Sequence, residues 1–131
     1  MTILVPVDGS ECSMRALEYA IGLAQSEDTD LHVVHFTDHE TEETTELEDR
    51  VQEHLDEAGM TAEVDVIGDV RLADFKSSQR IGKDILEVAA RHESDQIVMG
   101  HHGSGFVASA LLGSAAETVV STTEVPVTIV P

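Results

Sequence analysis

The stretch that decides the fold is IVMGHHG at residues 97–103, followed after nine intervening residues by Gly113 and Ser114. It begins as an apolar, strand-like run and leads into AAETVV, a helix-like segment at 115–120. Glycines let a backbone approach a ligand closely, and a helix start presents N–H groups that attract anions, phosphate above all. A strand, a glycine loop and a helix start in this order are typical of α/β proteins that bind nucleotides.

The rest of the chain alternates strand-like and helix-like segments. Apolar or β-rich runs predict strands at 2–7, 31–36, 62–67, 95–99 and 125–130. Apolar residues at helical spacing predict helices at 11–25, 38–57, from 81 onward and at 113–121, with an irregular stretch at 69–80. This alternation predicts an open parallel sheet with helices on both faces. No break in composition divides residues 1–131, so we expect a single domain.

The charge and the cysteine content exclude several classes of function and one kind of cross-link. The chain has 26 acidic and 7 basic residues, a formal net charge of −19, and such a surface repels nucleic acid and anionic membranes. Acids spread over a globular pattern with only two lysines indicate adaptation to high salt, and the alternative is an ordinary acidic protein. A single cysteine excludes an internal disulfide. No run of eighteen apolar residues and no signal-peptide pattern is present, so we expect a cytoplasmic protein.

Together these residues resemble the universal stress protein family, in its nucleotide-binding class. The resemblance covers nearly the whole chain and rests on four segments. They are PVDGS at 6–10, VHF at 34–36, the G-x2-G-x9-G-S pattern on Gly100, Gly103, Gly113 and Ser114, and PVTIV at 126–130. The resemblance implies a five-stranded parallel sheet of order 3-2-1-4-5 with helices on both faces. In that order the first and fourth strands border the ligand cleft.

The resemblance also implies a ligand, ATP. Because the net negative charge opposes a triphosphate, ADP, AMP or a neutral ligand are alternatives, and Mg²⁺ or concentrated K⁺ would offset the repulsion. The residues that would line its site are Pro6, Val7, Asp8, Phe36, Gly100, His102, Gly103, Gly113, Ser114 and Ala115. Asp8 would approach the adenosine, the backbone at Phe36 would meet the adenine edge, and the glycine pattern would hold ribose and phosphates. The family resemblance further implies a stress-response sensor or regulator that forms a homodimer through the strand at 126–130.

One feature departs from the family pattern. Members often carry a basic residue directly after the second glycine, where this chain has Ser104, and no Lys or Arg follows Arg91. The phosphates would then rest on backbone N–H groups, Ser114 and a helix dipole, with the bases of 69–80 as another source of charge. Two alternative functions therefore stay open: a dimeric interaction module without a nucleotide, and a weak ATP hydrolase. No catalytic set is visible, because no serine has an evident base with an orienting partner.

The remaining chemistry-bearing residues are Cys12 and the histidines. We expect Cys12 to be a small buried side chain. His101 and His102 lie at the mouth of the expected site, with His35 near them. Adjacent residues at a strand end point to opposite sides, so one at most of His101 and His102 would face a ligand. We therefore assign no metal site. His32, His39, His54 and His92 are predicted on the surface, without a role.

Overall fold

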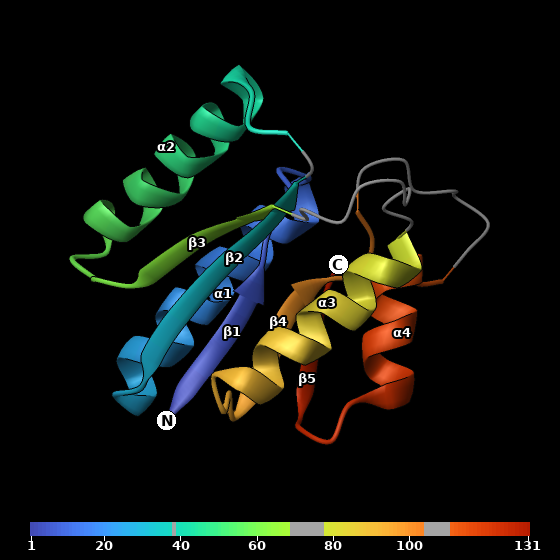
Figure 1. Cartoon of the computed structure of the whole chain (residues 1–131). Coiled ribbons are helices and arrows are strands. Elements are labelled where there is room, and N and C mark those ends of the chain that lie inside the picture. The colour runs from blue at the N-terminus through green and yellow to red at the C-terminus, as the bar shows by residue number, and fades with distance from the viewer. Residues whose placement is uncertain (38, 69–77, 104–110) are drawn as a thin grey trace.

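A computed structural model describes residues 1–37, 39–68, 78–103 and 111–131. The strands are β1 (Thr2–Pro6), β2 (Asp30–Thr37), β3 (Glu63–Gly68), β4 (Gln96–Gly100) and β5 (Val127–Val130). The helices are α1 (Glu11–Glu27), α2 (Glu42–Glu57), α3 (Ser78–Arg91) and α4 (Ser114–Thr122). All strand pairs are parallel and the order is β3-β2-β1-β4-β5 (Figure 1), which confirms the predicted sheet.

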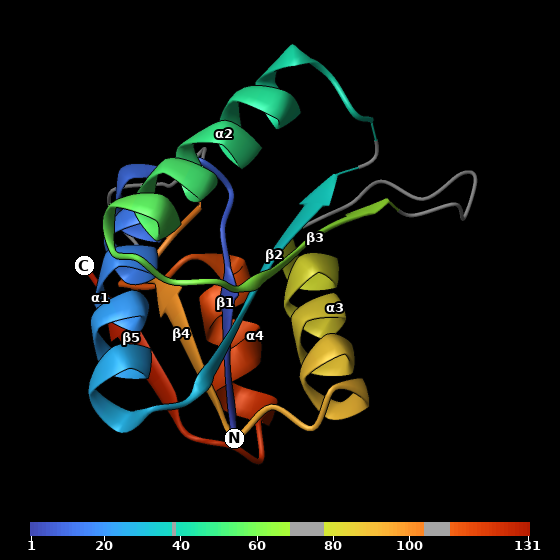
Figure 2. The same ribbon diagram turned by 90° about the vertical axis from the view of Figure 1, so that its left-hand side faces the viewer.

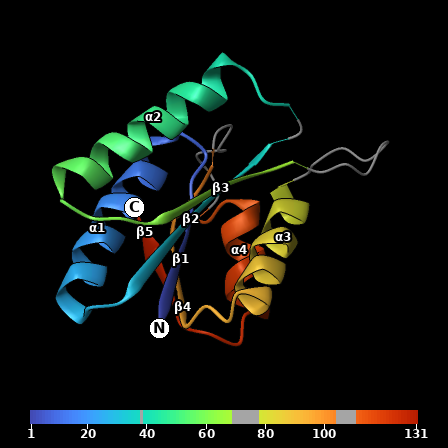
Figure 3. The same ribbon diagram turned by 60° about the vertical axis from the view of Figure 1, so that its left-hand side comes forward.

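The helices form a layer on each side of the sheet. Figures 2 and 3 show α1 and α2 over one face, and α3 and α4 over the other. The central strand β1 therefore supplies side chains to two cores: Val5 packs into the α1 and α2 side, and Leu4 into the α3 and α4 side. Burial on both faces explains why this strand is apolar from Ile3 to Pro6 rather than alternating.

The α1 and α2 layer follows the sequence pattern closely. Ser10 caps α1, and its Oγ accepts a hydrogen bond from the Ser13 amide at 3.3 Å. The predicted stripe of α2, Leu47, Val51 and Leu55, is buried. The helix begins at Glu42 instead of residue 38, because the Thr44 hydroxyl accepts from the Thr41 amide at 3.1 Å and fixes the first turn there. Residue 38 itself lies outside the described residues.

The α3 and α4 layer depends on one close approach between the two helices. A Cβ added at Gly82 of α3 would lie 2.7 Å from Cβ of Thr118 and 3.0 Å from the Ala115 carbonyl oxygen. Only glycine lets the two backbones come so near. The helix α3 starts at Ser78, so the last part of the stretch predicted to be irregular is helical, while residues 69–77 lie outside the described part of the chain.

Gly82→Ala is therefore expected to destabilise the protein by about 1 to 3 kcal/mol, since the new methyl group overpacks the helix contact. Gly22 provides the matched control, because it lies in α1 and a Cβ there would meet nothing within 4 Å. Gly22→Ala should stabilise by roughly 0.5 to 1 kcal/mol through helix propensity alone. Urea unfolding followed by circular dichroism measures both. Equal effects of the two variants would contradict the close approach of α3 and α4.

The acidic surface leads to a second stability prediction. The helix α2 alone carries eight acidic residues and one arginine. Raising KCl from about 0.1 M to about 1 M shortens the Debye length from roughly 10 Å to 3 Å and so screens their repulsion. We expect the melting temperature to rise by more than about 3 °C, which corresponds to roughly 1 kcal/mol in a domain of this size. The triple variant Glu46→Gln, Asp49→Asn, Glu53→Gln should show a smaller rise. If the melting temperature of the triple variant rises as much as that of the wild type, repulsion within α2 is not the cause of the salt effect.

None of the helices in the described part of the chain is long and apolar enough to cross a membrane.

Candidate functional site

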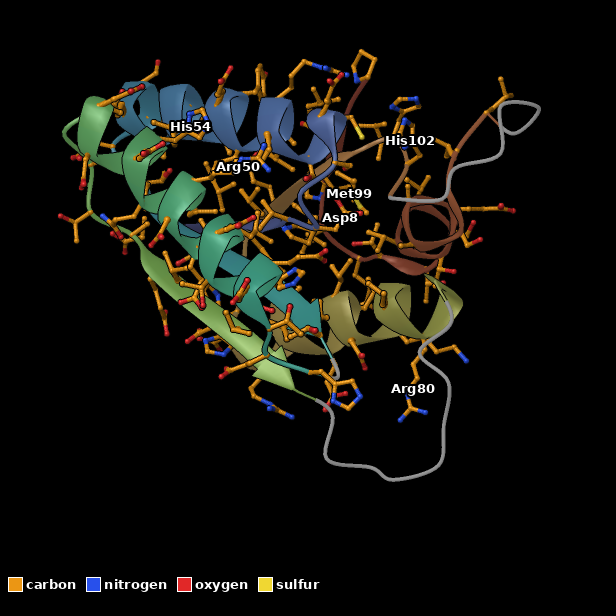
Figure 4. All side chains as sticks on the ribbon, turned by 90° about the horizontal axis from the view of Figure 1, so that it is seen from above. Asp8, Arg50, His54, Arg80, Met99 and His102 are labelled. Carbon is orange, nitrogen blue, oxygen red and sulfur yellow. The ribbon has the colours of Figure 1, made fainter. Side chains whose placement is uncertain are left out.

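The candidate site lies at the carboxyl edge of the sheet, where β1 and β4 end side by side. These strands are parallel neighbours, with Leu4 in register with Ile97. The chain leaves β1 at residues 7–10 and leaves β4 at residues 101–103. Viewed onto this edge, Figure 4 shows Asp8 close to the end of β4 at Met99, with His102 beyond it. The topology thus brings together two segments that are more than ninety positions apart.

Asp8 shapes the turn that follows β1. Its Oδ1 accepts hydrogen bonds from the Ser10 amide at 3.0 Å and the Ser10 hydroxyl at 2.5 Å. Between them Gly9 has φ +86°, a left-handed conformation that favours glycine. The second carboxylate oxygen faces the β4 loop, since a Cβ at Gly103 would lie 2.6 Å from Asp8 Oδ2. A glycine at 103 is therefore what allows the loop to approach this exposed carboxylate.

The start of α1 packs against the end of β4. A Cβ at Gly100 would lie 2.6 Å from Cys12 Sγ and 2.9 Å from the Ser13 amide nitrogen. The Cys12 thiol is buried, as expected, and donates to the His102 carbonyl oxygen at 2.9 Å. The loop after β4 is thus held to α1 by a steric fit and a hydrogen bond.

The start of α4 is tied to the same loop. The Gly113 amide donates to the His101 carbonyl oxygen at 2.7 Å, and a Cβ on Gly113 would lie 2.9 Å from Cα of His102. As the N-cap of α4, Gly113 has no side chain to accept from the first N–H groups of that helix. Ser114 is exposed beside it and Ala115 is half-buried. This helix start has the chemistry to accept an anion.

The predicted site residues fall into two groups. Asp8, His102, Gly103 and Gly113 surround the edge and are connected by the contacts above, and Ser114 is exposed next to Gly113. Pro6, Val7 and Gly100 are buried beneath them, Ala115 continues the α4 turn, and the Phe36 side chain is only 9% exposed within the core on the α3 and α4 side. The side chain of Phe36 therefore belongs to the core, which leaves its backbone as the part that could meet a ligand.

His35, which the sequence places near the mouth of the expected site, binds the backbone at the end of β1. Its Nδ1 donates to the Val7 carbonyl oxygen at 2.8 Å, while the Val7 amide donates to the Val34 carbonyl at 2.8 Å. These bonds extend the pairing of β1 and β2 one residue past the end of β1 and hold the backbone of Val7, the residue before Asp8.

The rings of His101 and His102 are in contact, which corrects the prediction that they point to opposite sides. Their centroids are 4.2 Å apart in an edge-to-face arrangement. The alternation fails because β4 ends at Gly100, and the period of two holds only within a strand. One donor atom each of Cys12, His101 and His102 lie within 4.8 Å of one another. Sulfur and imidazole donors in such a group are the kind that Zn²⁺ binds, so this edge carries metal-ligand chemistry beside the glycine loop.

Among the residues that the structure describes, positive charge is sparse around this edge. In Figure 4 the Arg80 side chain extends from the start of α3 away from Asp8. Arg15 donates through Nε to the Pro131 carbonyl oxygen at 2.7 Å, and Arg91 pairs with Glu87 at 2.7 Å. Arg71, Lys76 and Ser104 lie outside the described residues.

Comparisons with known proteins agree with this architecture. The chain matches the Universal stress protein family over residues 1–131. It is 34% identical to a universal stress protein of Thermus aquaticus, covering 98% of this chain and 97% of the relative. Two solved structures show the same fold. A universal stress protein in complex with cAMP has a TM-score of 0.75, 20% identity and coverage of 100% and 97%. The universal stress protein from Archaeoglobus fulgidus in complex with dAMP has a TM-score of 0.69, 23% identity and coverage of 100% and 98%. The chain therefore belongs to the universal stress protein family.

Proposed function

We propose that this protein binds an adenine nucleotide, ATP in the first place, at the carboxyl edge between β1 and β4. The observation that carries the proposal is the convergence of three groups: the Asp8 carboxylate, the Gly103 backbone and the uncapped start of α4. A carboxylate accepts from hydroxyl or amino groups, and a helix start accepts phosphate. The structures with cAMP and dAMP support this ligand class.

The roles of the residues follow from their chemistry. Asp8 accepts from the ribose hydroxyls, and the backbone at Phe36 meets the adenine edge. Gly100 and Gly103 let the backbone pass close to ribose and phosphates, with His102 beside them. Ser114 and the first-turn N–H groups of α4, including that of Ala115, hold the phosphates, and the helix dipole contributes about 1 kcal/mol or less.

The net charge of −19 opposes a triphosphate. Mg²⁺ or concentrated K⁺ offsets that repulsion, so the affinity for ATP should depend on cations more strongly than the affinity for AMP does. Calorimetric titrations of ATP, ADP and AMP into the full chain, in concentrated KCl with and without Mg²⁺, test this. Micromolar binding of ATP that strengthens with Mg²⁺ is the expected result. Absence of binding by all three nucleotides would refute the proposed function.

In this proposal the protein is a cytoplasmic, salt-adapted stress-response regulator. Nucleotide binding stabilises the loop after β4 and the start of α4, and the changed surface is what a protein partner reads. Homodimerisation through residues 126–130 fits the position of β5 at the edge of the sheet, since an open edge invites pairing. Sedimentation velocity of the wild type and Ile129→Pro tests the dimer. The carbonyls of Pro126 and Val130 accept from β4, so the amide of Ile129 faces the open edge, and proline there removes a donor from that edge.

A specific observation favours a second candidate, an interaction module of the same fold that needs no nucleotide. No Lys or Arg follows Arg91, and Arg80 extends away from Asp8. Dimerisation without detectable nucleotide binding would select this candidate. A phosphate-release assay with Mg²⁺ addresses the remaining alternative, a weak ATP hydrolase, which requires turnover that Asp8→Ala abolishes.

A further inference from the structure

A second polar cluster lies at the opposite, amino end of the sheet and is centred on His32. The sequence placed this histidine on the surface, but it is only 1% exposed. The prediction was wrong because β2 is covered on both faces, and His32 lies on the face that Val34 and Phe36 share with α3. A histidine in this setting needs polar partners, because burying an unpaired polar group is costly.

The two nitrogens of the His32 ring have different surroundings. Nε2 lies 2.7 Å from Oδ2 of Asp65 on the neighbouring strand. A carboxylate only accepts, so Nε2 carries the proton and donates. Nδ1 is buried and has no hydrogen-bond partner among the residues that the structure describes. In the neutral ring it therefore presents an unused lone pair inside the protein, which calls for a partner.

Two further ligand groups lie beside this ring. His92, just after α3, has its ring centroid 4.7 Å from that of His32. Glu63 is the register partner of His32 on β3. One donor atom each of His32, Glu63 and His92 lie within 4.8 Å of one another. Glu63 and His92 are exposed, so the cluster is open to solvent on one side and anchored by a buried histidine on the other.

We propose that His32, His92 and Glu63 bind a divalent transition metal, Zn²⁺ in the first place. Two imidazoles and one carboxylate form a ligand set that Zn²⁺ accepts with a fourth position left for water. Asp65 is the positioning residue, because a carboxylate that accepts from the second ring nitrogen fixes the tautomer and orientation of a metal-bound histidine. Nitrogen donors favour Zn²⁺, Ni²⁺ or Cu²⁺ over Mg²⁺ and Ca²⁺, which prefer oxygen.

The charge of the protein assists this site. A net charge of −19 raises the local concentration of cations around the surface. The site is independent of the nucleotide proposal, because its ligands come from β2, β3 and the end of α3 at the other end of the sheet. It is also separate from the group of Cys12, His101 and His102, which lies at the carboxyl edge.

The test is calorimetric titration of Zn²⁺ into the full chain near neutral pH, without nucleotide, in a Cys12→Ser background that weakens the other donor group. We expect a single saturable site. His92→Ala and Glu63→Gln each remove an exposed ligand and should weaken binding at least about tenfold, while Asp65→Asn should weaken it about 10- to 100-fold without removing a ligand. His39→Ala removes an exposed histidine outside the cluster and should bind like the background protein.

Ring resonances in a long-range ¹H–¹⁵N spectrum locate the metal. Zn²⁺ should shift the nitrogens of His32 and His92 and leave those of His39 in place, and Asp65→Asn should alter the His32 shifts. Shifts confined to other histidines, or equal affinity of His92→Ala, Glu63→Gln and His39→Ala, would overturn the proposal. Circular dichroism confirms that each variant is folded. If His92→Ala is not folded, the affinity of Glu63→Gln for Zn²⁺ tests the proposal alone, because Glu63 is the first residue of β3 and its side chain is exposed.

Discussion

Gly113→Val is expected to weaken binding of ATP and AMP about 10- to 100-fold. A Cβ at this position lies 2.9 Å from Cα of His102 and 3.4 Å from the amide nitrogen of Gly103, so a side chain displaces the loop that the proposed site uses. Displacement of packed backbone costs about 1 to 3 kcal/mol, which gives that range of affinity. Valine is chosen because it adds bulk without charge, whereas a lysine here would also attract phosphate. Calorimetry in concentrated KCl measures the change.

Two controls make this result specific. Gly22→Ala changes a glycine with open space around it and should bind nucleotide like the wild type. Circular dichroism of Gly113→Val should show the helix content of the wild type, because the substitution acts at the N-cap and not within the sheet. Unchanged affinity in a folded Gly113→Val protein would mean that the nucleotide binds elsewhere.

Gly100→Ala is expected to cause a large loss of stability, about 3 kcal/mol or roughly 10 °C in melting temperature. The added methyl group would lie 2.6 Å from Cys12 Sγ, 2.9 Å from the Ser13 amide nitrogen and 3.0 Å from the Cys12 carbonyl carbon. Two of these atoms are backbone at the start of α1, which the core holds in place. Chemical denaturation followed at the far-ultraviolet helix signal gives the free energy of unfolding.

A double-mutant cycle with Cys12→Ala identifies the contact responsible. Removing the sulfur relieves the shortest of the three contacts, so Gly100→Ala should cost about 1 kcal/mol less in the Cys12→Ala background than in the wild type. If the two substitutions change the free energy of unfolding additively, contact with the Cys12 thiol is not the reason for the cost of Gly100→Ala.

The sequence was sufficient for most of the fold. Buried stripes such as Leu47, Val51 and Leu55 and the cap at Ser10 are local patterns, and the structure has them where the pattern predicts. The order of the strands came from the family resemblance, since periodicity does not determine which strands are neighbours. Helix starts were less accurate, because the Thr41–Thr44 cap that begins α2 depends on side-chain hydrogen bonds in one turn.

Two of the polar contacts that were missed join distant parts of the chain. The buried ring of His32 has a polar partner because Asp65, which lies on β3, accepts a hydrogen bond from it, and that pairing depends on the register of two strands. Cys12 was expected only to be buried, yet it contacts the His102 carbonyl ninety residues away. The roles assigned to Asp8, Gly103 and Gly113 remain predictions, although the structure brings these three residues to one edge.

The bond from the His101 amide to the Val130 carbonyl, at 2.9 Å, has a thermodynamic consequence. It joins the loop of the proposed nucleotide site to Val130, the last residue of the edge strand β5. The nucleotide site and the proposed dimer edge are therefore connected directly through the backbone. If a second copy of the chain pairs with β5, nucleotide binding and dimer formation become linked equilibria. A nucleotide that binds the dimer more tightly than the monomer by some factor must strengthen the dimer by the same factor, because linkage is reciprocal. Cellular nucleotide level would then set the fraction of the protein that is assembled.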